Sequence, residues 1–267
     1  MVVFGCSLNE LAVMHYKAVP AFLEKCFDYI IRNGLNLEGI FRISGDFAEA
    51  SRVQSSIDAT DDLVINENTN PFIVANIISR FFRAIPGHVL IDKRADQWFN
   101  IKTVDDAKRN FQKLPLINKA IFSRLVGLLS IVAKNSDSNK MTPLALSIVM
   151  SPNLIERDDL SAFLLPKEVL IIMIENYEEI FKGMSALDEN GNFLPENEFT
   201  ASIGDVCMEF FCKSSPVPLK LKPIEEENHY RLSRNFQIEP ADFNTVMNDL
   251  FTFPTDNSVI VDSYVNI

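Results

Sequence analysis

Apolar residues recur at helical spacing through the first two thirds of this 267-residue chain, and this periodicity most constrains its fold. Along one stretch after another, apolar side chains stand three or four positions apart, which is the spacing of one buried helix face. These stretches are 20–33, 47–57, 71–85, 116–134 and 166–181. Up to residue 183 no run alternates between apolar and polar residues as a half-buried strand would. We therefore expect an all-α domain.

Capping residues and prolines mark where these helices begin and end. Asn70 and Thr142 each precede a proline, which favours an N-cap followed by proline at the first helical position. Thr103 is expected to cap a further, polar helix. Gly34 closes the helix that begins after Pro20.

Charge separates a nearly neutral region from an acidic one. Residues 1–183 carry 22 acidic and 20 basic side chains, whereas residues 184–267 carry 14 acidic and 5 basic. We therefore expect a helical domain at 3–183 and an acidic C-terminal extension at 184–267. Its scattered apolar residues favour disorder, with short helices around 201–212 and 240–250. The net charge of −11 argues against a broad basic face for phosphates, so nucleic acid is not an expected partner.

The pattern of cysteines and histidines gives no sign of a metal site. The four cysteines form no CxxC pair, and no histidine stands at zinc-ligand spacing from them. We expect reduced thiols, no metal and no cofactor. No segment approaches the roughly 18 to 20 apolar residues of a membrane helix, so no membrane insertion is expected.

The loop after the first long helix places an arginine between two glycines, in the run Glu38-Gly39-Ile40-Phe41-Arg42-Ile43-Ser44-Gly45. The glycines allow the backbone to turn tightly. Ile40, Phe41 and Ile43 are expected to anchor the loop in the core and to leave Arg42 projecting. Taken by itself, a loop arginine is more often simply solvated.

The run EGIFRISG resembles the hallmark of the RhoGAP family, the GTPase activators of Rho-type G proteins. Further blocks resemble that family in the same order, namely VANIISRFFRAIP at 74–86, Pro115 with Asn118, MTPLALSIVMSPNL at 141–154 and IENYEEIF at 174–181. Together they span nearly all of residues 3–183 and are far more specific than one motif. The resemblance implies a bundle of about nine helices, no nucleotide bound by this chain itself, and Arg42 as the arginine finger.

The resemblance also implies a GTPase-binding surface, in which this chain departs from the family at two positions. The family's arginine before a Leu-Pro-like pair corresponds to Arg83, and its lysine four positions earlier is replaced by Ser79. Arg80 lies on a neighbouring part of the helix face and is expected to cover some of that role. The family's interface asparagine is replaced by Ala145, and Ile148 corresponds to an apolar position that touches the GTPase. We expect a working activator that Ser79 and Ala145 weaken.

The expected partner is a Rho- or Rac-type GTPase in its GTP-bound state. We expect a monomeric, cytoplasmic protein that is recruited to membranes through that GTPase. One alternative is a RhoGAP-like binding module or scaffold without catalytic effect, which Ser79 and Ala145 favour and Arg42 opposes. A more distant alternative is an enzyme with its own chemistry, although the histidines have no spaced partners for a catalytic triad or metal site. These are His15, His88 and His229.

Overall fold

The computed structural model describes residues 3–15, 17–66, 68–155 and 167–199, together with the backbone of two strands between residues 220 and 233. The chain divides into two compact units, Met1–Phe199 and Thr200–Ile267. Within its described residues, the first unit is helical. Its α-helices are α1 (Leu8–His15), α2 (Ala21–Asn33), α3 (Phe47–Thr60), α4 (Pro71–Ala84), α5 (Ala95–Phe99), α6 (Val104–Gln112), α7 (Leu116–Lys134), α8 (Ser136–Asn139), α9 (Pro143–Met150), α10 (Lys167–Glu175) and α11 (Tyr177–Ile180). Two short 3-10 helices are η1 (Asp92–Arg94) and η2 (Ser151–Asn153).

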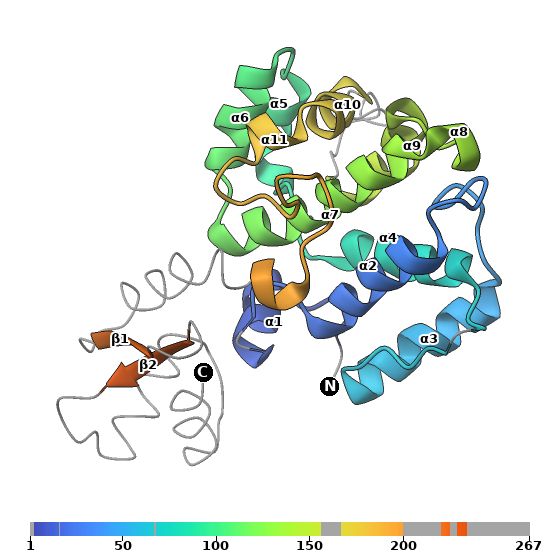
Figure 1. Ribbon diagram of the computed structural model, residues 1–267, viewed down its shortest axis with the longest axis horizontal. Helices are drawn as coiled ribbons and strands as arrows, with labels where there is room; N and C mark the ends of the chain where they lie inside the picture. Colours follow the sequence, from blue (N-terminus) through green and yellow to red (C-terminus); the bar gives the residue numbers. More distant parts are fainter. Residues whose placement is uncertain are drawn as a thin grey trace. The chain divides into compact units, whose positions relative to one another are not determined.

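Helix α7 forms the centre of this unit. Fifteen of its 19 residues are buried, and Figure 1 shows it running between α1 to α4 on one side and α5, α6, α9, α10 and α11 on the other. By length and hydropathy α7 resembles a membrane span, but 83% of its apolar stretch is buried inside the domain. We therefore interpret α7 as the core helix around which the others pack.

The predicted capping residues are confirmed. Oδ1 of Asn70 accepts the N–H two residues further on at 3.0 Å, and Oγ1 of Thr142 accepts the N–H of Ala145 at 3.2 Å. Thr103 forms a full capping box with Asp106 at the start of α6. These contacts satisfy backbone donors that a helix leaves unpaired at its first turn.

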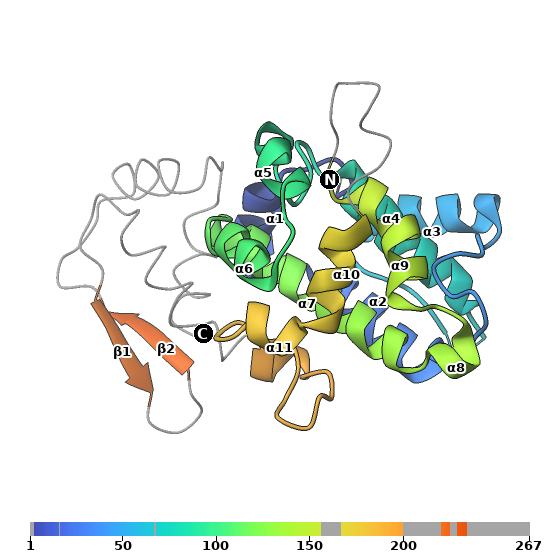
Figure 2. The same cartoon turned by 90° about the horizontal axis from the view of Figure 1, so that it is seen from above.

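The all-α prediction is confirmed for the domain. The described residues form more helices, several of them short, than the nine or so that the resemblance implied. They contain eleven α-helices, and three of these, α5, α8 and α11, have only four or five residues. The helix expected at 166–181 is divided at Asn176, whose φ of −116° and ψ of 36° lie outside helical geometry. Figure 2 shows the short α8 beside the end of α2.

Residues 184–199 belong to the helical unit, although their charge suggested that they were part of the extension. A turn at 188–191 reverses the chain and returns apolar side chains to the core. The centroid of the Phe193 ring lies 3.8 Å from Cζ of the buried Arg124. Arg124 also donates to the carbonyl of Leu194 at 2.7 Å. We therefore place the end of the domain at residue 199.

The second unit contains one hairpin among its described residues. Strands β1 (Lys220–Ile224) and β2 (His229–Ser233) pair antiparallel, with Lys220 opposite Ser233. The sequence patterns had not indicated these strands. The short helices expected around 201–212 and 240–250 lie outside the described residues. With the boundary at 199, the C-terminal unit carries 10 acidic and 5 basic side chains. Its net charge of −5 is smaller in magnitude than the −9 of residues 184–267.

Candidate functional site

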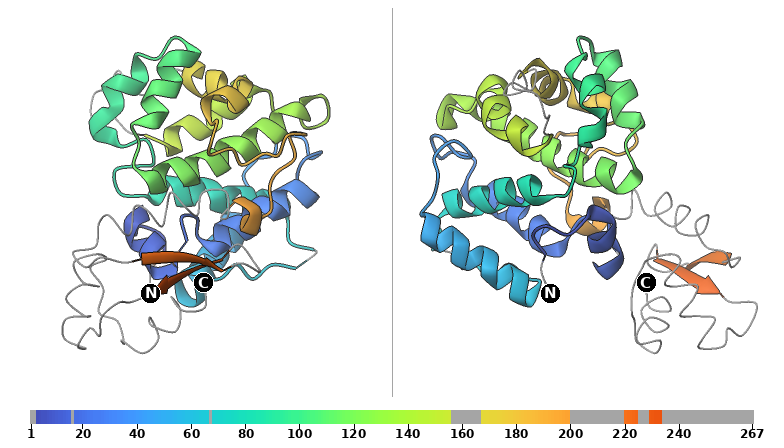
Figure 3. Two further views of the ribbon diagram at one scale, coloured as in Figure 1. Left: turned by 60° about the vertical axis from the view of Figure 1, so that its left-hand side comes forward. Right: turned by 180° about the vertical axis from the view of Figure 1, so that it is seen from behind.

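The loop between α2 and α3 carries Arg42 at one end of the helical unit. Figures 1 and 3 show this loop beside α8 and the start of α9. On its other side, Gly45 packs against α4, because a Cβ at that glycine would stand only 2.9 Å from the backbone nitrogen of Ile73. The loop is therefore held between two helical elements that are distant in sequence.

Two residues of this loop have left-handed backbone geometry. Gly39 has a φ of 76°, and Phe41 has a φ of 68°. The N–H groups of Arg42 and Ile43 both donate to the carbonyl of Gly39 at 2.8 Å, and the N–H of Gly39 donates to the carbonyl of Asn139 at 2.7 Å. Such a conformation costs a residue with a side chain about 1–2 kcal/mol. Strained residues cluster at functional sites, although Asp61, His88, Ile91 and Lys140 of this chain also have positive φ.

The side chain of Arg42 is exposed, and no described residue forms a hydrogen bond or ion pair with its guanidinium group. Its Nη2 lies 3.3 Å from the place of a Cβ on Gly39, so the missing side chain of that glycine leaves room for it. Ile40 anchors the loop in the core with no exposed surface, but Ile43 is 48% exposed. The prediction that Ile43 is an anchor is therefore wrong, because the turn closed by Gly39 directs this residue outward.

Exposed apolar side chains lie on the same loop and on the helices next to it. They are Ile43, Phe47 at the start of α3, and Leu144 and Ile148 on α9, with exposed fractions of 48%, 76%, 50% and 49%. Leu144 and Ile148 are four positions apart and so share one face of α9. We call these four residues the apolar surface. Exposed apolar side chains on neighbouring elements are candidates for an interaction site.

Only one residue of the apolar surface, Ile148, was expected to contact a partner, as the resemblance implied. Ile148 is exposed, and its contact role stays a prediction. Phe47 looked like the first core position of its helix, but only Ala50 and Ile57 of α3 are buried. Leu144 was not distinguished from the other apolar residues of a helix whose composition is almost entirely apolar.

Arg80 extends from α4 towards α3. Its Nη1 donates to Oγ of Ser51 at 3.1 Å and to Oε1 of Gln54 at 3.2 Å. Its Cζ lies 4.8 Å from the ring centroid of Phe47, which is a cation–π contact. Arg80 is thus held against the helix that follows the Arg42 loop, and it supports the most exposed residue of the apolar surface.

Ser79 and Arg83 face a different neighbour, the end of α9 and η2. Oγ of Ser79 donates to the carbonyl of Ala75 at 3.1 Å and lies 3.6 Å from Sδ of Met150. Nε of Arg83 donates to Oδ1 of the buried Asn153 at 2.8 Å. Arg83 therefore joins α4 to η2, and the three polar residues predicted on α4 do not all converge on one point.

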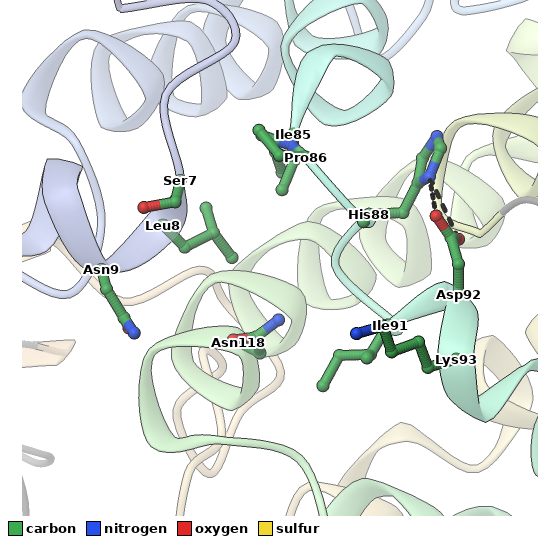
Figure 4. A pocket seen from close by; sticks show the side chains of 11 residues that line it. Ser7, Leu8, Asn9, Ile85, Pro86, His88, Ile91, Asp92, Lys93 and Asn118 are labelled. Atoms are coloured by element: carbon green, nitrogen blue, oxygen red, sulfur yellow. Dashed lines mark hydrogen bonds and ion pairs between the residues drawn. The ribbon is translucent and has the colours of Figure 1, made fainter.

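A pocket of about 440 Å³ lies between the start of α1, the segment after α4 and the start of α7. Figure 4 shows that His88 and Asp92 in this pocket point towards each other, with Nδ1 of His88 3.0 Å from Oδ2 of Asp92. The hydroxyl of Ser7, which also lines the pocket, donates to Glu10 at 2.7 Å. His88 therefore has an acidic partner but no nucleophile bonded to its ring, and this pocket does not form a catalytic triad. The side chains of His15 and His229 lie outside the described residues.

Among the described residues, no group of three or more histidine, cysteine, aspartate or glutamate side chains could hold a metal ion. Cys26 is a buried free thiol, and Cys207 and Cys212 lie outside the described residues. Burial raises the pKa of the Cys26 thiol above its usual range. That thiol is therefore protonated and inert at neutral pH.

Comparison with known proteins gives a family match over the part of the chain that holds Arg42. The model of the RhoGAP domain matches residues 20–159, just over half of the chain. The chain is 27% identical over 159 residues to Rho GTPase-activating protein 17 of Homo sapiens, covering 57% of this chain and 18% of that protein. It is 29% identical over 161 residues to Rho GTPase-activating protein gacJJ of Dictyostelium discoideum, covering 58% of this chain and 18% of that protein. The chain therefore spans less than a fifth of the length of these curated relatives.

Solved structures show the same fold. Human Rho GTPase activating protein 15 aligns with a TM-score of 0.63 at 21% identity, covering 67% of this chain and 92% of that one. The BH domain from GRAF, the GTPase regulator associated with focal adhesion kinase, aligns with a TM-score of 0.56 at 22% identity, covering 60% of this chain and 93% of that one. The helical arrangement is therefore one that has been observed by experiment.

Proposed function

Because this chain belongs to the RhoGAP domain family, we propose that it binds a Rho- or Rac-type small GTPase in its GTP-bound state and accelerates GTP hydrolysis with Arg42. The observation that carries this proposal is an exposed arginine without a partner among the described residues, on a loop whose backbone is closed by hydrogen bonds. Such a side chain can enter another protein's active site without first breaking a contact of its own.

The mechanism follows from the charge that develops during phosphoryl transfer. Negative charge spreads over the oxygens of the transferred phosphoryl group, and a cation placed there stabilises the transition state more than the bound substrate. In the Ras and Gα systems an arginine finger supplies about 10³ to 10⁵ in rate. Arg42 would supply this charge in trans, while the partner holds the nucleotide and its magnesium ion.

The apolar surface supplies a means of docking. Ile43, Phe47, Leu144 and Ile148 leave roughly half or more of their side-chain area in solvent, and burying apolar area contributes about 25 cal/mol per Å². Aromatic anchors near the centre of an interface carry a large share of binding energy. Phe47, already supported from one side by Arg80, is the best candidate for such an anchor.

The two departures from the family reduce the polar contacts that this chain can offer to a GTPase. Ser79 has no charge, and Ala145 has no side-chain donor or acceptor. Arg80 can compensate for the missing lysine only through its present position against α3, or after leaving Ser51 and Gln54. We therefore expect this chain to bind through apolar contacts more than through charge, and to be a weaker activator than a domain with both polar residues.

A second candidate function is a binding module that holds the GTP-bound GTPase without changing its rate. The observation that favours it is that Ser79 and Ala145 are neutral, whereas the apolar surface is exposed and available for binding. In that case the chain would prefer the GTP state, and hydrolysis would continue at its intrinsic rate.

Single-turnover hydrolysis by Rho and Rac GTPases preloaded with GTP tests the proposal. The chain is added at increasing concentration, and both the saturating rate and the half-saturating concentration are measured. We expect acceleration by the unaltered chain and a loss of about 10³ in the saturating rate for Arg42→Ala. The matched control is Arg109→Ala, because Arg109 is an equally charged, exposed residue on α6.

Each outcome selects one function. Acceleration that Arg42→Ala removes and Arg109→Ala preserves supports catalysis by Arg42. Selective binding of the GTP state without acceleration selects the binding module. Equal acceleration by the unaltered chain and Arg42→Ala rejects the arginine finger.

A further inference from the structure

We propose that Asn139 is a positioning residue for Arg42, and that it acts by holding the backbone of the Arg42 loop. This inference rests on the proposed function for its catalytic consequence. Its structural part, the immobilisation of the loop by one buried amide, can be measured on the free protein.

The side chain of Asn139 is completely buried and uses its hydrogen-bonding capacity on three segments of the chain. Its Nδ2 donates to the carbonyl of Leu35 at 2.7 Å, at the beginning of the Arg42 loop, and to the carbonyl of Val132 at 2.9 Å, near the end of α7. Its Oδ1 accepts the N–H of Met141 at 2.8 Å, just before α9. One amide group therefore joins the loop to α7 and to the segment that leads into α9.

The main chain of Asn139 continues this connection towards Arg42. Its carbonyl accepts the N–H of Gly39 at 2.7 Å, and the carbonyl of Gly39 accepts the N–H groups of Arg42 and Ile43. Only Gly39 stands between the buried amide residue and the backbone of Arg42. The two contacts to the loop, at Leu35 and at Gly39, enclose the stretch over which the chain turns before the arginine.

Asparagine is the residue type that this position requires. The side chain accepts from the N–H two residues later, an Asx turn, while Lys140 between them adopts a left-handed φ of 60°. Aspartate can form the same turn but has no donor for the two carbonyls, and serine has one hydroxyl in place of the amide. Asn139 therefore closes the turn through Oδ1 and donates two further hydrogen bonds, to the carbonyls of Leu35 and Val132, through Nδ2. Neither aspartate nor serine can form all three hydrogen bonds.

A displaced loop would matter because catalysis depends on where the guanidinium stands in the transition state. A misplacement of about 1 Å by a change far from the chemistry can cost 10²-fold in rate. If Asn139 acts only through Arg42, its loss should lower the saturating rate and leave the half-saturating concentration nearly unchanged. That pattern indicates loss of an interaction made in the transition state.

The experiment combines hydrogen exchange on the free chain with single-turnover hydrolysis. Asn139→Ala removes all three side-chain bonds, and Asn139→Ser retains the turn but removes the paired donors. We expect both variants to lose exchange protection at the amides of Gly39, Arg42 and Ile43. We also expect the saturating rate to fall by about 10- to 100-fold. In an Arg42→Ala background, Asn139→Ala should cause no further loss.

The matched control is Tyr177→Phe, which also removes a buried group with three hydrogen bonds. The hydroxyl of Tyr177 contacts Oγ and the carbonyl of Ser123 and the N–H of Ala186, at 2.9, 3.0 and 2.7 Å. The Tyr177→Phe variant tests for general destabilisation. We expect it to leave unchanged both the exchange protection of the three loop amides and the saturating rate.

Several results would overturn the inference. These are unchanged protection of the three amides, an equal rate loss from Tyr177→Phe, or an additional loss from Asn139→Ala when Arg42 is already absent. Failure of the unaltered chain to accelerate hydrolysis would reject the proposed function. The exchange measurement would then still decide whether Asn139 holds the loop, because loss of protection supports that claim and full protection contradicts it.

Discussion

Nη1 of Arg124, on the central helix α7, donates to the carbonyl oxygen of Leu194 at a distance of 2.7 Å. The same guanidinium donates from Nε to Glu24 on α2 at 2.9 Å and makes a second contact to that carboxylate through Nη2. Burial raises the pKa of Glu24, and the hydrogen bonds and charge of Arg124 oppose this shift. Because Arg124 has no exposed surface, the segment that ends at residue 199 helps to satisfy a charge in the core.

The end of the domain can be tested by truncation. We expect residues 1–199 to unfold in urea at the same midpoint as the full chain. Residues 1–183 should be less stable by about 3–5 kcal/mol, because they lack the carbonyl and the aromatic rings that surround a buried ion pair. Against a typical stability of about 5–15 kcal/mol, that loss is large. Equal midpoints for the two truncated chains would contradict this account of Arg124.

The buried hydroxyl of Tyr177 predicts a dependence of stability on alkaline pH. Burial raises the pKa of Tyr177 from its usual value of 10.0 to about 12, although its hydrogen bonds with Ser123 oppose the shift. The folded state therefore favours the neutral phenol. Its contribution to stability is fully present below about pH 10 and is lost as the pH rises through about 12, by about 1.4 kcal/mol per pH unit.

This dependence should be measured as the difference between the unaltered chain and Tyr177→Phe. We expect the difference in unfolding free energy to be nearly constant from pH 8 to about 9.5 and to shrink by about 2.3 kcal/mol by pH 12. Subtracting the phenylalanine variant removes the titration of lysines and other tyrosines that the two proteins share. A constant difference across the whole range would show that Tyr177 titrates normally.

Phe47→Ala should weaken GTPase binding without destabilising the fold. The ring is 76% exposed, so its removal costs little packing within the domain. Loss of an aromatic anchor from an interface typically costs about 2 kcal/mol or more, which corresponds to roughly 30-fold in affinity. The matched control is Val64→Ala, which removes a side chain that is 70% exposed on a different loop, between α3 and α4.

Affinity for the GTP-bound GTPase and the urea midpoint should be measured together for both variants. A loss of affinity for Phe47→Ala alone, at an unchanged midpoint, supports the apolar surface as the docking site. Equal affinities for the two variants would remove Phe47 from that site.

Local sequence signals predicted the helices and the arginine loop more successfully than the contacts of individual side chains. The caps at Asn70, Thr103 and Thr142 depend on neighbouring residues and were therefore visible in the sequence. Phe47 stands at a position that periodicity assigns to the core, and Ile43 was expected to anchor the loop, but both side chains are exposed in the structure.

Long-range relationships could not be predicted in the same way. Asn139 stands 104 positions from Leu35, and no local pattern relates the two. Because residues 184–199 include several acidic side chains, their charge predicted an extension, although apolar residues among them return to the core. In both cases the decisive partner lies far away in the sequence, so the outcome depends on tertiary packing rather than on propensity.

The last prediction concerns the two positions at which this chain departs from its family. Ser79→Lys would place a cation on α4, beside the end of α9, and Ala145→Asn would add a neutral donor and acceptor on α9. A charge pair at an interface is worth about 2–5 kcal/mol by truncation, and a neutral hydrogen bond about 1 kcal/mol. We therefore expect Ser79→Lys to tighten binding of the GTP-bound GTPase by at least about 30-fold, and Ala145→Asn by about 5-fold.

Net charge must be separated from position in this test. Gln112→Lys, on the exposed end of α6, adds the same charge at a site that the proposal does not use. If Ser79→Lys tightens binding and Gln112→Lys does not, the gain depends on a contact made at α4, and the natural serine limits the affinity of this domain. Equal gains for the two lysines would mean that the acidic chain is simply repelled by its partner, because long-range steering depends on net charge rather than on one contact. The weakness expected of this activator would then have its origin in overall charge and not in the surface around Arg42.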